Sequence, residues 1–480
     1  MKETFLEEAE RLKPALRLCR HAVSPHAPVT EEGLLLDFET HMTGYVSLRF
    51  SFAGARADSP VMVRVFFAER LCELEEDPQN YRGWISRGWI QEEILRIDSF
   101  PREEAFSRRF AFRYIKITPC AVPREGQLVL DSASVTAQSA AGERPTPAGR
   151  GAAERKIDEI ALKTLSECMQ DVIEDGPKRD RRLWAGDLRL AGLSNGLTFR
   201  DFRLVKRCLY LFAGTALSDG RICQSVFADG TPEGDGATNF DYPLQYAAAV
   251  SDYYFLSGDR EAAEALLPCA EAQILASRRF FTDGVVRNGE TGWCFVDWSM
   301  DLDRQAAAQG IYLFAEEALI RLLIALGRGA APYEADLKAK REAGRRAFFD
   351  PESGLVRSGD GRQVSLASQI WALRGGMLDA AEGKRALAAA QAEPGCIGCV
   401  TPYLVHDFLE ALLLCGEKEQ ARRTMLRYYG GMAEEGADTF WEFYFPENPS
   451  YSPYGGTAVH SYCHVWSSTP CYLLRKYFTD

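Results

Sequence analysis

Tryptophans stand beside carboxylates in three separate segments of the chain. These segments are residues 175–187 around Trp184, residues 297–303 around Trp298, and the pair Trp441-Glu442. Carboxylates hydrogen-bond pairs of sugar hydroxyls, and an indole face packs on the C–H face of a sugar ring. Core packing explains one such neighbourhood equally well, but three of them favour a carbohydrate site.

Hydrolysis of a glycosidic bond normally needs two carboxyl groups, one protonated and one ionised. The candidates come from distant segments, residues 175–187 and Glu442. Glu442 lies in the aromatic run Phe440–Phe445, where an ionisable side chain is costly to bury without a purpose. Glu447 is its nearest competitor, and spacing alone does not choose the pair.

Composition narrows the class of function. The chain has 480 residues, with 56 Lys and Arg against 68 Asp and Glu, and a formal charge of −12. This excess of acid argues against a nucleic-acid partner and against a membrane surface bound through a basic face. We therefore expect an enzyme that acts on a small or neutral substrate. The sequence leaves the oligomeric state open, a homodimer included.

Several features predict a cytoplasmic protein. The amino terminus is acidic and lacks the apolar core of a signal peptide, and no apolar run of membrane-spanning length occurs. The 13 cysteines are an odd number in a large chain, which is typical of buried thiols. Cys396-x-x-Cys399 is the one such cysteine motif in the sequence, and no histidines lie near it, so we predict no zinc site there. We also predict no other metal and no cofactor.

The elements that must hold these residues fall into four segments. Residues 1–32 are expected to be a helical segment, with a helix from about Glu3 to Cys19. Residues 33–140 contain runs that alternate at period two and are separated by turn residues, which predicts an antiparallel β-sandwich. Residues 141–153 are rich in Gly, Pro and Ala and predict a linker.

Residues 154–480 show apolar residues at spacings of three and four, which predicts about eleven helices. The expected helices are 157–173, 202–217, 242–256, 260–281, 305–326, 333–349, 365–378, 383–392, 404–415, 418–429 and 460–478. An (α/α)6 barrel needs twelve, so the pattern fits that fold with one helix missed. An α-solenoid is the alternative, but no repeat of fixed period supports it.

Four motifs in order resemble the α-L-rhamnosidases of glycoside hydrolase family 78. The motifs are Asp175-Gly-Pro-Lys-Arg-Asp-Arg-Arg-Leu-Trp-Ala-Gly-Asp187, Phe295-Val-Asp-Trp298, Gly436-Ala-Asp-Thr-Phe-Trp-Glu442 and Ser461-Tyr-Cys-His-Val-Trp-Ser467. The resemblance covers most of residues 155–480, and the β-sandwich is similar to the family's accessory domain. It implies an inverting hydrolase with an (α/α)6 barrel and no cofactor.

The resemblance also implies roles for individual residues. Asp180 falls at the position of the general acid and Glu442 at that of the general base. The positions that contact substrate are implied to be Asp175, Arg179, Trp184, Asp187, Trp298 and His464, and we add Asp297 and Trp441 as substrate-binding candidates from their segments. Inverting chemistry requires the two carboxyls to stand about 6.5–9.5 Å apart.

Other interpretations of these residues stay open. Asp175 is also a suitable residue for a turn before Gly176-Pro177. Trp184 and Trp298 could fill the core, and His464 could be a buried histidine of the last helix, one turn after His460. That pair has the spacing of two metal ligands but lacks a third. Arg179, Arg181 and Arg182 would lower the pKa of Asp180, which is wrong for an acid, unless they point elsewhere.

The family usually has glutamate where this chain has Asp180, and the missing methylene withdraws the carboxyl by about 1.5 Å. Three functions follow. The first is the release of terminal α-L-rhamnose or a related deoxyhexose, and the second is a glycosidase of the same fold with another sugar specificity. The third is an inactive carbohydrate-binding protein. Linkage, aglycone and pathway lie beyond the sequence.

Overall fold

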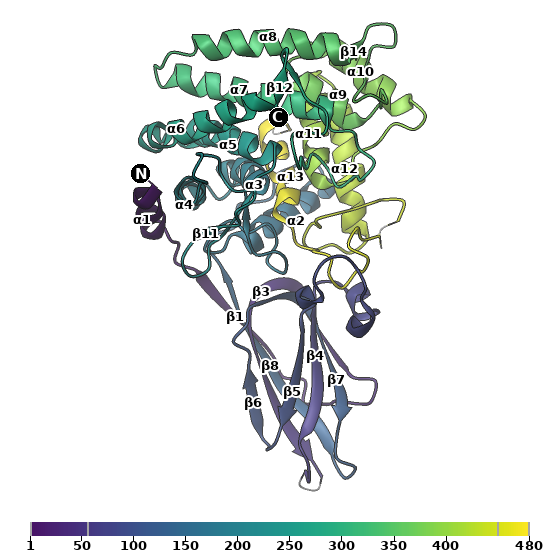
Figure 1. The fold of residues 1–480 in the computed structure, drawn as a ribbon. Helices are drawn as coiled ribbons and strands as arrows, with labels where there is room; N and C mark the ends of the chain where they lie inside the picture. Colours follow the sequence, from purple (N-terminus) through teal and green to yellow (C-terminus); the bar gives the residue numbers. More distant parts are fainter. Residues whose placement is uncertain (1, 55–56, 449–450, 479–480) are drawn as a thin grey trace.

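The computed structural model describes residues 2–54, 57–448 and 451–478. A β-sheet domain stands below a larger helical domain in Figure 1, and helix α1 (Lys2–Arg11) lies against the helical domain. Buried Phe5 and Ala9 attach α1 to α4 (Phe202–Gly214), with the Phe5 and Tyr210 rings 5.2 Å apart. In the described ranges, no helix combines the length and apolar character needed to cross a bilayer.

The first helix is shorter than the sequence predicted. It ends at Arg11 instead of Cys19, and residues 17–23 form strand β1, which pairs with β8. Pro14 explains the difference, because proline removes a backbone donor and disfavours helical backbone in the residue before it. The expected helical segment 1–32 therefore contributes the first two strands to the sheet domain.

The sheet domain is antiparallel, as predicted. Its strands are β1 (Arg17–Val23), β2 (Ala27–Pro28), β3 (Leu34–Ala53), β4 (Val61–Ala68), β5 (Glu92–Ile97), β6 (Arg102–Ala105), β7 (Phe110–Ala121) and β8 (Gln127–Ser139). The hydrogen-bonded order is β1-β8-β3-β7-β4-β5, with β2 on β8 and β6 on β3.

The long strand β3 joins two layers of this domain. Residues 34–44 pair with β7, whereas residues 44–53 pair with β8 and, in part, with β6. The layers meet at Gly44, where a Cβ atom would lie 2.3 Å from the carbonyl oxygen of Thr136. Apolar side chains of β3, β4, β7 and β8 fill the space between the layers and form one core.

The helical domain contains the twelve helices that an (α/α)6 barrel needs, counted over the described residues. The inner helices are α3 (Ala185–Leu197), α5 (Asp241–Ser257), α7 (Gln305–Ala325), α9 (Leu366–Arg374), α11 (Pro402–Leu414) and α13 (Pro470–Tyr477). The outer helices are α2 (Ala152–Cys168), α4, α6 (Arg260–Ser277), α8 (Ala331–Phe348), α10 (Ala380–Ala392) and α12 (Lys418–Glu434). Successive inner helices pack together, and α13 with the short helix η5 (Val465–Ser468) closes the ring against α3. The barrel is therefore confirmed.

Short β-elements occupy the loops of the barrel. They are the strands β9 (Leu183–Trp184), β10 (Ser225–Phe227) and β11 (Glu233–Gly234), and the hairpins β12 (Phe281–Thr282)–β13 (Val285–Val286) and β14 (Phe349–Asp350)–β15 (Leu355–Val356). The first group matters most, because β9 pairs Trp184 with Ser225 and so fixes the start of α3.

The sequence missed α3 and misplaced the last helix. Eleven of the thirteen α3 residues are buried, so the helix has no polar face to create an amphipathic pattern. The last helix begins at Pro470 instead of residue 460. The chain before it is held irregular by distant partners: the His464 N–H donates to the Phe440 carbonyl, and the Val465 N–H donates to the Asp175 carbonyl.

Candidate active site

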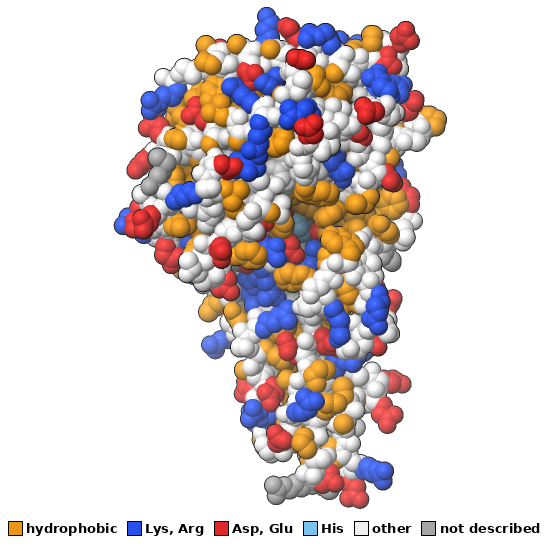
Figure 2. All heavy atoms as spheres, in the orientation of Figure 1, with side chains coloured by type: hydrophobic (Ala, Val, Ile, Leu, Met, Phe, Trp, Pro, Cys, Tyr) orange, Lys and Arg blue, Asp and Glu red, His pale blue; other side chains and the backbone are white. Residues whose placement is uncertain are grey.

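A cavity of about 490 Å³ opens where α3 and α5 begin, and it gathers most of the predicted site. Figure 2 shows the hollow in this face of the molecule, with hydrophobic side chains at its rim. Eight of the ten predicted residues line the cavity: Asp175, Arg179, Asp180, Trp184, Asp187, Trp298, Glu442 and His464. The three segments singled out in the sequence therefore meet at one place.

Glu442 is held rigidly in the wall of this cavity. Its backbone N–H donates to the Ser461 carbonyl at 3.0 Å, and its carbonyl accepts from Trp466 Nε1 at 3.0 Å. The Arg179 guanidinium donates to one carboxylate oxygen and the Tyr454 hydroxyl donates to the other. Burial raises the pKa of Glu442, while Arg179 and Tyr454 oppose the rise. A carboxylate so placed is poised to accept a proton.

The loop that carries Asp180 is organised by Asp175. The Asp175 carboxylate accepts from the backbone N–H of Asp180 at 2.9 Å and of Arg182 at 3.1 Å. Asp175 therefore forms the turn that the alternative interpretation described, and it also lines the cavity. Burial and the neighbouring charge of Asp180 raise its pKa well above the ordinary value.

Two of the three arginines near Asp180 point away from it. Arg181 donates to the carbonyl of Arg109 at 2.7 Å, and the Arg182 guanidinium lies 4.5 Å from the centre of the Phe227 ring. Arg179, in contrast, lies next to Asp180, with its Nη1 atom 3.7 Å from Asp180 Oδ1. Its other terminal nitrogen, Nη2, donates to the Glu442 carboxylate. One guanidinium thus lies between the two predicted catalytic carboxyls.

Asp187 and His464 each present a buried polar atom that makes no hydrogen bond within the described residues. Within the described residues, Asp187 Oδ1 and His464 Nδ1 are buried without a hydrogen bond, and they lie 3.6 Å apart. Burial raises the pKa of Asp187 well above its ordinary value and lowers that of His464 well below. Unpaired buried polar atoms are costly, so these atoms are suited to bind ligand hydroxyls.

Aromatic rings form the rest of the wall, and several of them were not predicted. Trp184 and Trp298 line the cavity and pack against other rings, Trp184 against Tyr242 at 6.1 Å and Trp298 against Phe295 at 5.3 Å. The residues that sequence reasoning missed include Trp84, Tyr242, Phe295, Tyr454 and Trp466. Trp466 stood inside a recognised motif and could have been found, whereas Trp84 belongs to the sheet domain.

Two predicted binding residues, Asp297 and Trp441, lie behind the cavity instead of lining it, which corrects their assignment. The fully buried Asp297 carboxylate accepts from Val400 N at 2.7 Å, Thr401 Oγ1 at 2.6 Å and Trp298 N at 2.9 Å, so its oxygens are occupied. Trp441 is 1% exposed, and the Arg70 guanidinium lies 4.1 Å from its ring centre. These residues join loops that carry the site.

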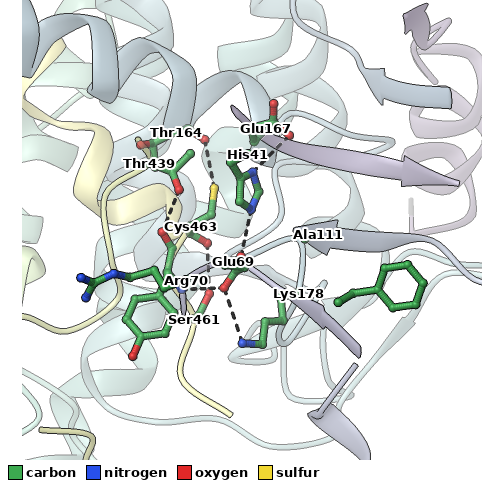
Figure 3. A network of polar contacts seen from close by, with 12 residues as sticks. His41, Glu69, Arg70, Ala111, Thr164, Glu167, Lys178, Thr439, Ser461 and Cys463 are labelled. Atoms are coloured by element: carbon green, nitrogen blue, oxygen red, sulfur yellow. Dashed lines mark hydrogen bonds and ion pairs between the residues drawn. The ribbon is translucent and has the colours of Figure 1, made fainter. Parts of the chain in front are cut away.

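The sheet domain contacts two segments of the candidate site through a buried network (Figure 3). Lys178, two residues before Asp180, donates to Glu73 and lies 3.7 Å from Glu69 Oε2. Glu69 also accepts from the Tyr462 N–H at 2.7 Å and contacts His41 Nε2 at 3.0 Å. Burial raises the pKa of Glu73 to about 7. The accessory domain therefore helps to position the site.

The two histidines do not have the helical spacing that suggested a pair of ligands. His460 and His464 lie in irregular chain before α13 instead of one turn apart on a helix. Burial lowers the pKa of His460 well below its ordinary value, with Arg179 and Lys178 contributing. In the part of the chain that the structure describes, no three His, Cys, Asp or Glu side chains are grouped to hold a metal.

Comparisons with known proteins agree with this geometry. Residues 22–137 match the glycosyl hydrolase family 78 alpha-rhamnosidase N-terminal domain. Residues 154–478 match the bacterial alpha-L-rhamnosidase 6 hairpin glycosidase domain. A search of curated protein sequences found no match.

Solved structures of rhamnosidases are similar to this chain as well. A rhamnosidase from Klebsiella oxytoca with rhamnose bound is 36% identical, with 99% of each chain covered and a TM-score of 0.94. The fold is shared with a GH78 rhamnosidase of Bacillus sp. GL1, which is 19% identical over 94% of this chain and 47% of that chain, with a TM-score of 0.77. It is also shared with the Streptomyces avermitilis alpha-L-rhamnosidase complexed with L-rhamnose, 18% identical over 96% of this chain and 44% of that chain, with a TM-score of 0.69. The two domain matches and the whole-length similarity establish that the chain belongs to glycoside hydrolase family 78 and is a glycoside hydrolase of the α-L-rhamnosidase type.

Proposed function

We propose that the protein releases terminal α-L-rhamnose, with inversion, using Asp180 as general acid and Glu442 as general base. The observation that carries this proposal is the position of Arg179 between the two carboxyls at the wall of one cavity. The Klebsiella oxytoca rhamnosidase, which is similar over its whole length and has rhamnose bound, supports the choice of sugar.

The proposed reaction is a single displacement. Glu442 accepts a proton from a water molecule while the water oxygen bonds to the anomeric carbon, and Asp180 gives its proton to the glycosidic oxygen as that bond breaks. Burial raises the pKa of Glu442, and Arg179 opposes that rise and so favours the ionised form that a base requires. The side chain of Asp180 is 20% exposed, so it reaches the cavity.

The distance between the carboxyls is compatible with inversion. Because the terminal nitrogens of one guanidinium are about 2.3 Å apart, the nearest oxygens of Asp180 and Glu442 are within roughly 9 Å of each other. That bound accommodates the separation of about 6.5–9.5 Å that leaves room for a water molecule. Asp187 and His464, with their unpaired polar atoms, are the proposed partners of the sugar hydroxyls.

The test is hydrolysis of an aryl α-L-rhamnoside, with the first product anomer followed by NMR. We expect the inverted anomer, and retention would contradict the mechanism. Glu442→Gln should lose about 10²–10⁴ in rate, because the amide cannot accept the proton. Glu447→Gln is the matched control on the exposed part of the same loop.

Asp180→Asn should lose activity mainly on substrates with poor leaving groups, which need protonation most. Full activity of Asp180→Asn on such substrates would remove Asp180 as the acid. A panel of other aryl glycosides tests the sugar, since fold and chemistry vary less than specificity. Binding of rhamnose without turnover of any glycoside would instead identify a carbohydrate-binding protein.

A further inference from the structure

A strained turn carries two rings of the proposed rhamnose cavity. The Asp297 N–H donates to the Phe295 carbonyl at 2.5 Å, which closes a three-residue γ-turn around Val296. Val296 has a φ of +53°, a left-handed backbone that is costly for a β-branched residue. Phe295 and Trp298, on either side of this turn, both line the cavity. Such strain persists only where the surrounding groups hold it.

Asp241, the first residue of α5, holds the turn from its N–H side. One oxygen of its carboxylate accepts from the Phe295 N–H at 3.0 Å, and the other accepts from the Val296 N–H at 3.0 Å. Asp241 is 1% exposed, and burial raises its pKa while these two N–H groups and Arg304 oppose the rise. A carboxylate with both oxygens occupied in this way acts on a ligand only through the backbone that it binds.

Arg304 holds the same turn from its carbonyl side. Its guanidinium donates to the carbonyls of Phe295 at 3.2 Å and Ser299 at 2.7 Å, and more weakly to that of Asp297 at 3.4 Å. Hydrogen bonds in which one partner is charged are about twice as strong as neutral ones. An anion on the N–H groups and a cation on the carbonyls therefore clamp residues 295–299 from both sides.

The ring of Trp298, which this clamp holds in the cavity wall, has a polar atom without a partner. Within the described residues, Trp298 Nε1 is buried without a hydrogen bond, while the ring packs against Phe295 at 5.3 Å. Phe295 in turn stacks on Trp466 at 5.6 Å. An indole N–H in this state is suited to donate to a sugar hydroxyl. A change in the turn would therefore move both a ring face and a hydrogen-bond donor.

We propose that Asp241 is a positioning residue of the rhamnose site, because it holds the turn at Val296 so that Trp298 meets the sugar. Arg304 is the second member of the same clamp. The proposal rests on the proposed function, since the cavity must hold the rhamnose. Neither Asp241 nor Arg304 is among the described side chains that line the cavity. Both therefore act on the binding of the sugar instead of on the proton transfers at the two carboxyls.

The test is a double-mutant cycle on an aryl α-L-rhamnoside, with Asp241→Asn and Trp298→Ala separately and together. Asparagine keeps the size of the side chain, but its NH2 group opposes one of the two backbone N–H groups. We expect Asp241→Asn to raise KM about tenfold with little change in kcat, because a displaced wall residue removes binding that the ground and transition states share. In the Trp298→Ala background the same change should raise KM less than about twofold, since Asp241 acts through a ring that is no longer present.

The matched control is Asp201→Asn. Asp201 accepts from the Leu204 N–H at 3.0 Å at the start of α4, and it follows the end of α3 that lies away from the cavity. This variant should leave KM unchanged. If Asp241→Asn does not fold, Arg304→Gln takes its place in the cycle, because it removes the clamp from the carbonyl side. The same dependence on Trp298 is expected.

Equal KM factors in the two backgrounds would overturn the proposal, because they would mean that Asp241 supports the fold in general. A loss confined to kcat would overturn it as well. Hydrogen exchange of the peptide 293–300 needs no turnover: Asp241→Asn should speed its exchange about tenfold, and an unchanged rate would also overturn the proposal. A wild type that hydrolyses no rhamnoside contradicts the proposed function instead, and the exchange rates then decide whether Asp241 holds the turn.

Discussion

The hydroxyl of Tyr454 should set the pH range in which the proposed base works. It donates to one oxygen of Glu442, and its ring packs over Arg179 at 4.1 Å and beside Trp84 at 5.4 Å. Tyr454→Phe keeps the ring and removes only the donor. A hydrogen bond to a charged group contributes about 1.5–3 kcal/mol. Its loss disfavours the carboxylate and raises the pKa of Glu442 further, by roughly one to two units.

The assay is the pH profile of kcat/KM on an aryl α-L-rhamnoside. The base acts only when ionised, so activity is lost as pH falls through its pKa, and a raised pKa moves the acidic limb upward by about one to two pH units. The plateau at higher pH should change little. The matched control is Tyr333→Phe, which removes a similar bond to Glu271 (3.0 Å) on the outer helices. An acidic limb that stays in place while the plateau falls would refute this reasoning.

Three further predictions concern the acid, the domain interface and the barrel. Asp180→Glu should keep or raise kcat on alkyl rhamnosides, because its carboxyl extends about 1.5 Å further into an open cavity; a slower enzyme would mean overpacking. Lys178→Met should cost about 3–5 kcal/mol in urea unfolding at pH 8 by leaving buried Glu73 unpaired, and adding Glu73→Gln should restore part of that loss. Gly310→Ala should lower the unfolding free energy by about 1–3 kcal/mol, since its Cβ would lie 2.2 Å from an α9 carbonyl oxygen, whereas Gly329→Ala has nothing within 4 Å.

Local residue patterns were enough to predict the architecture. Alternation at period two indicated the antiparallel domain, and spacings of three and four indicated eleven of the helices. The pattern failed at α3 because the inner ring buries this helix on nearly every side, so its sequence carries no polar stripe. It failed at residues 460–469 because distant groups bind the backbone there: Tyr462 N–H donates to Glu69, His464 N–H to the Phe440 carbonyl and Val465 N–H to the Asp175 carbonyl.

The sequence by itself also determined most of the candidate site. The segments that hold Asp180 and Glu442 were recognisable because several tryptophans stand beside carboxylates there, and the resemblance to family 78 then implied the roles of the individual residues. Adjacent residues remained ambiguous: Glu442 faces the cavity while Trp441 packs behind it, and Trp298 lines the cavity while Asp297 is buried beneath. The direction of a side chain depends on what surrounds the loop, which residue type does not encode.

Only the tertiary structure decided how the two domains share the site. Trp84 and the Glu69–Glu73 segment are about a hundred residues or more from the segments they touch, and nothing in their local sequence indicates a catalytic neighbourhood. Trp84 is held there by its hydrogen bond to the Pro453 carbonyl. The Glu69–Glu73 segment is held by the ion pair between Glu73 and Lys178, because a buried charge is costly unless it is paired. Such contacts between residues distant in the sequence form only when the whole chain packs. Sequence periodicity reports on neighbouring residues and therefore does not predict them.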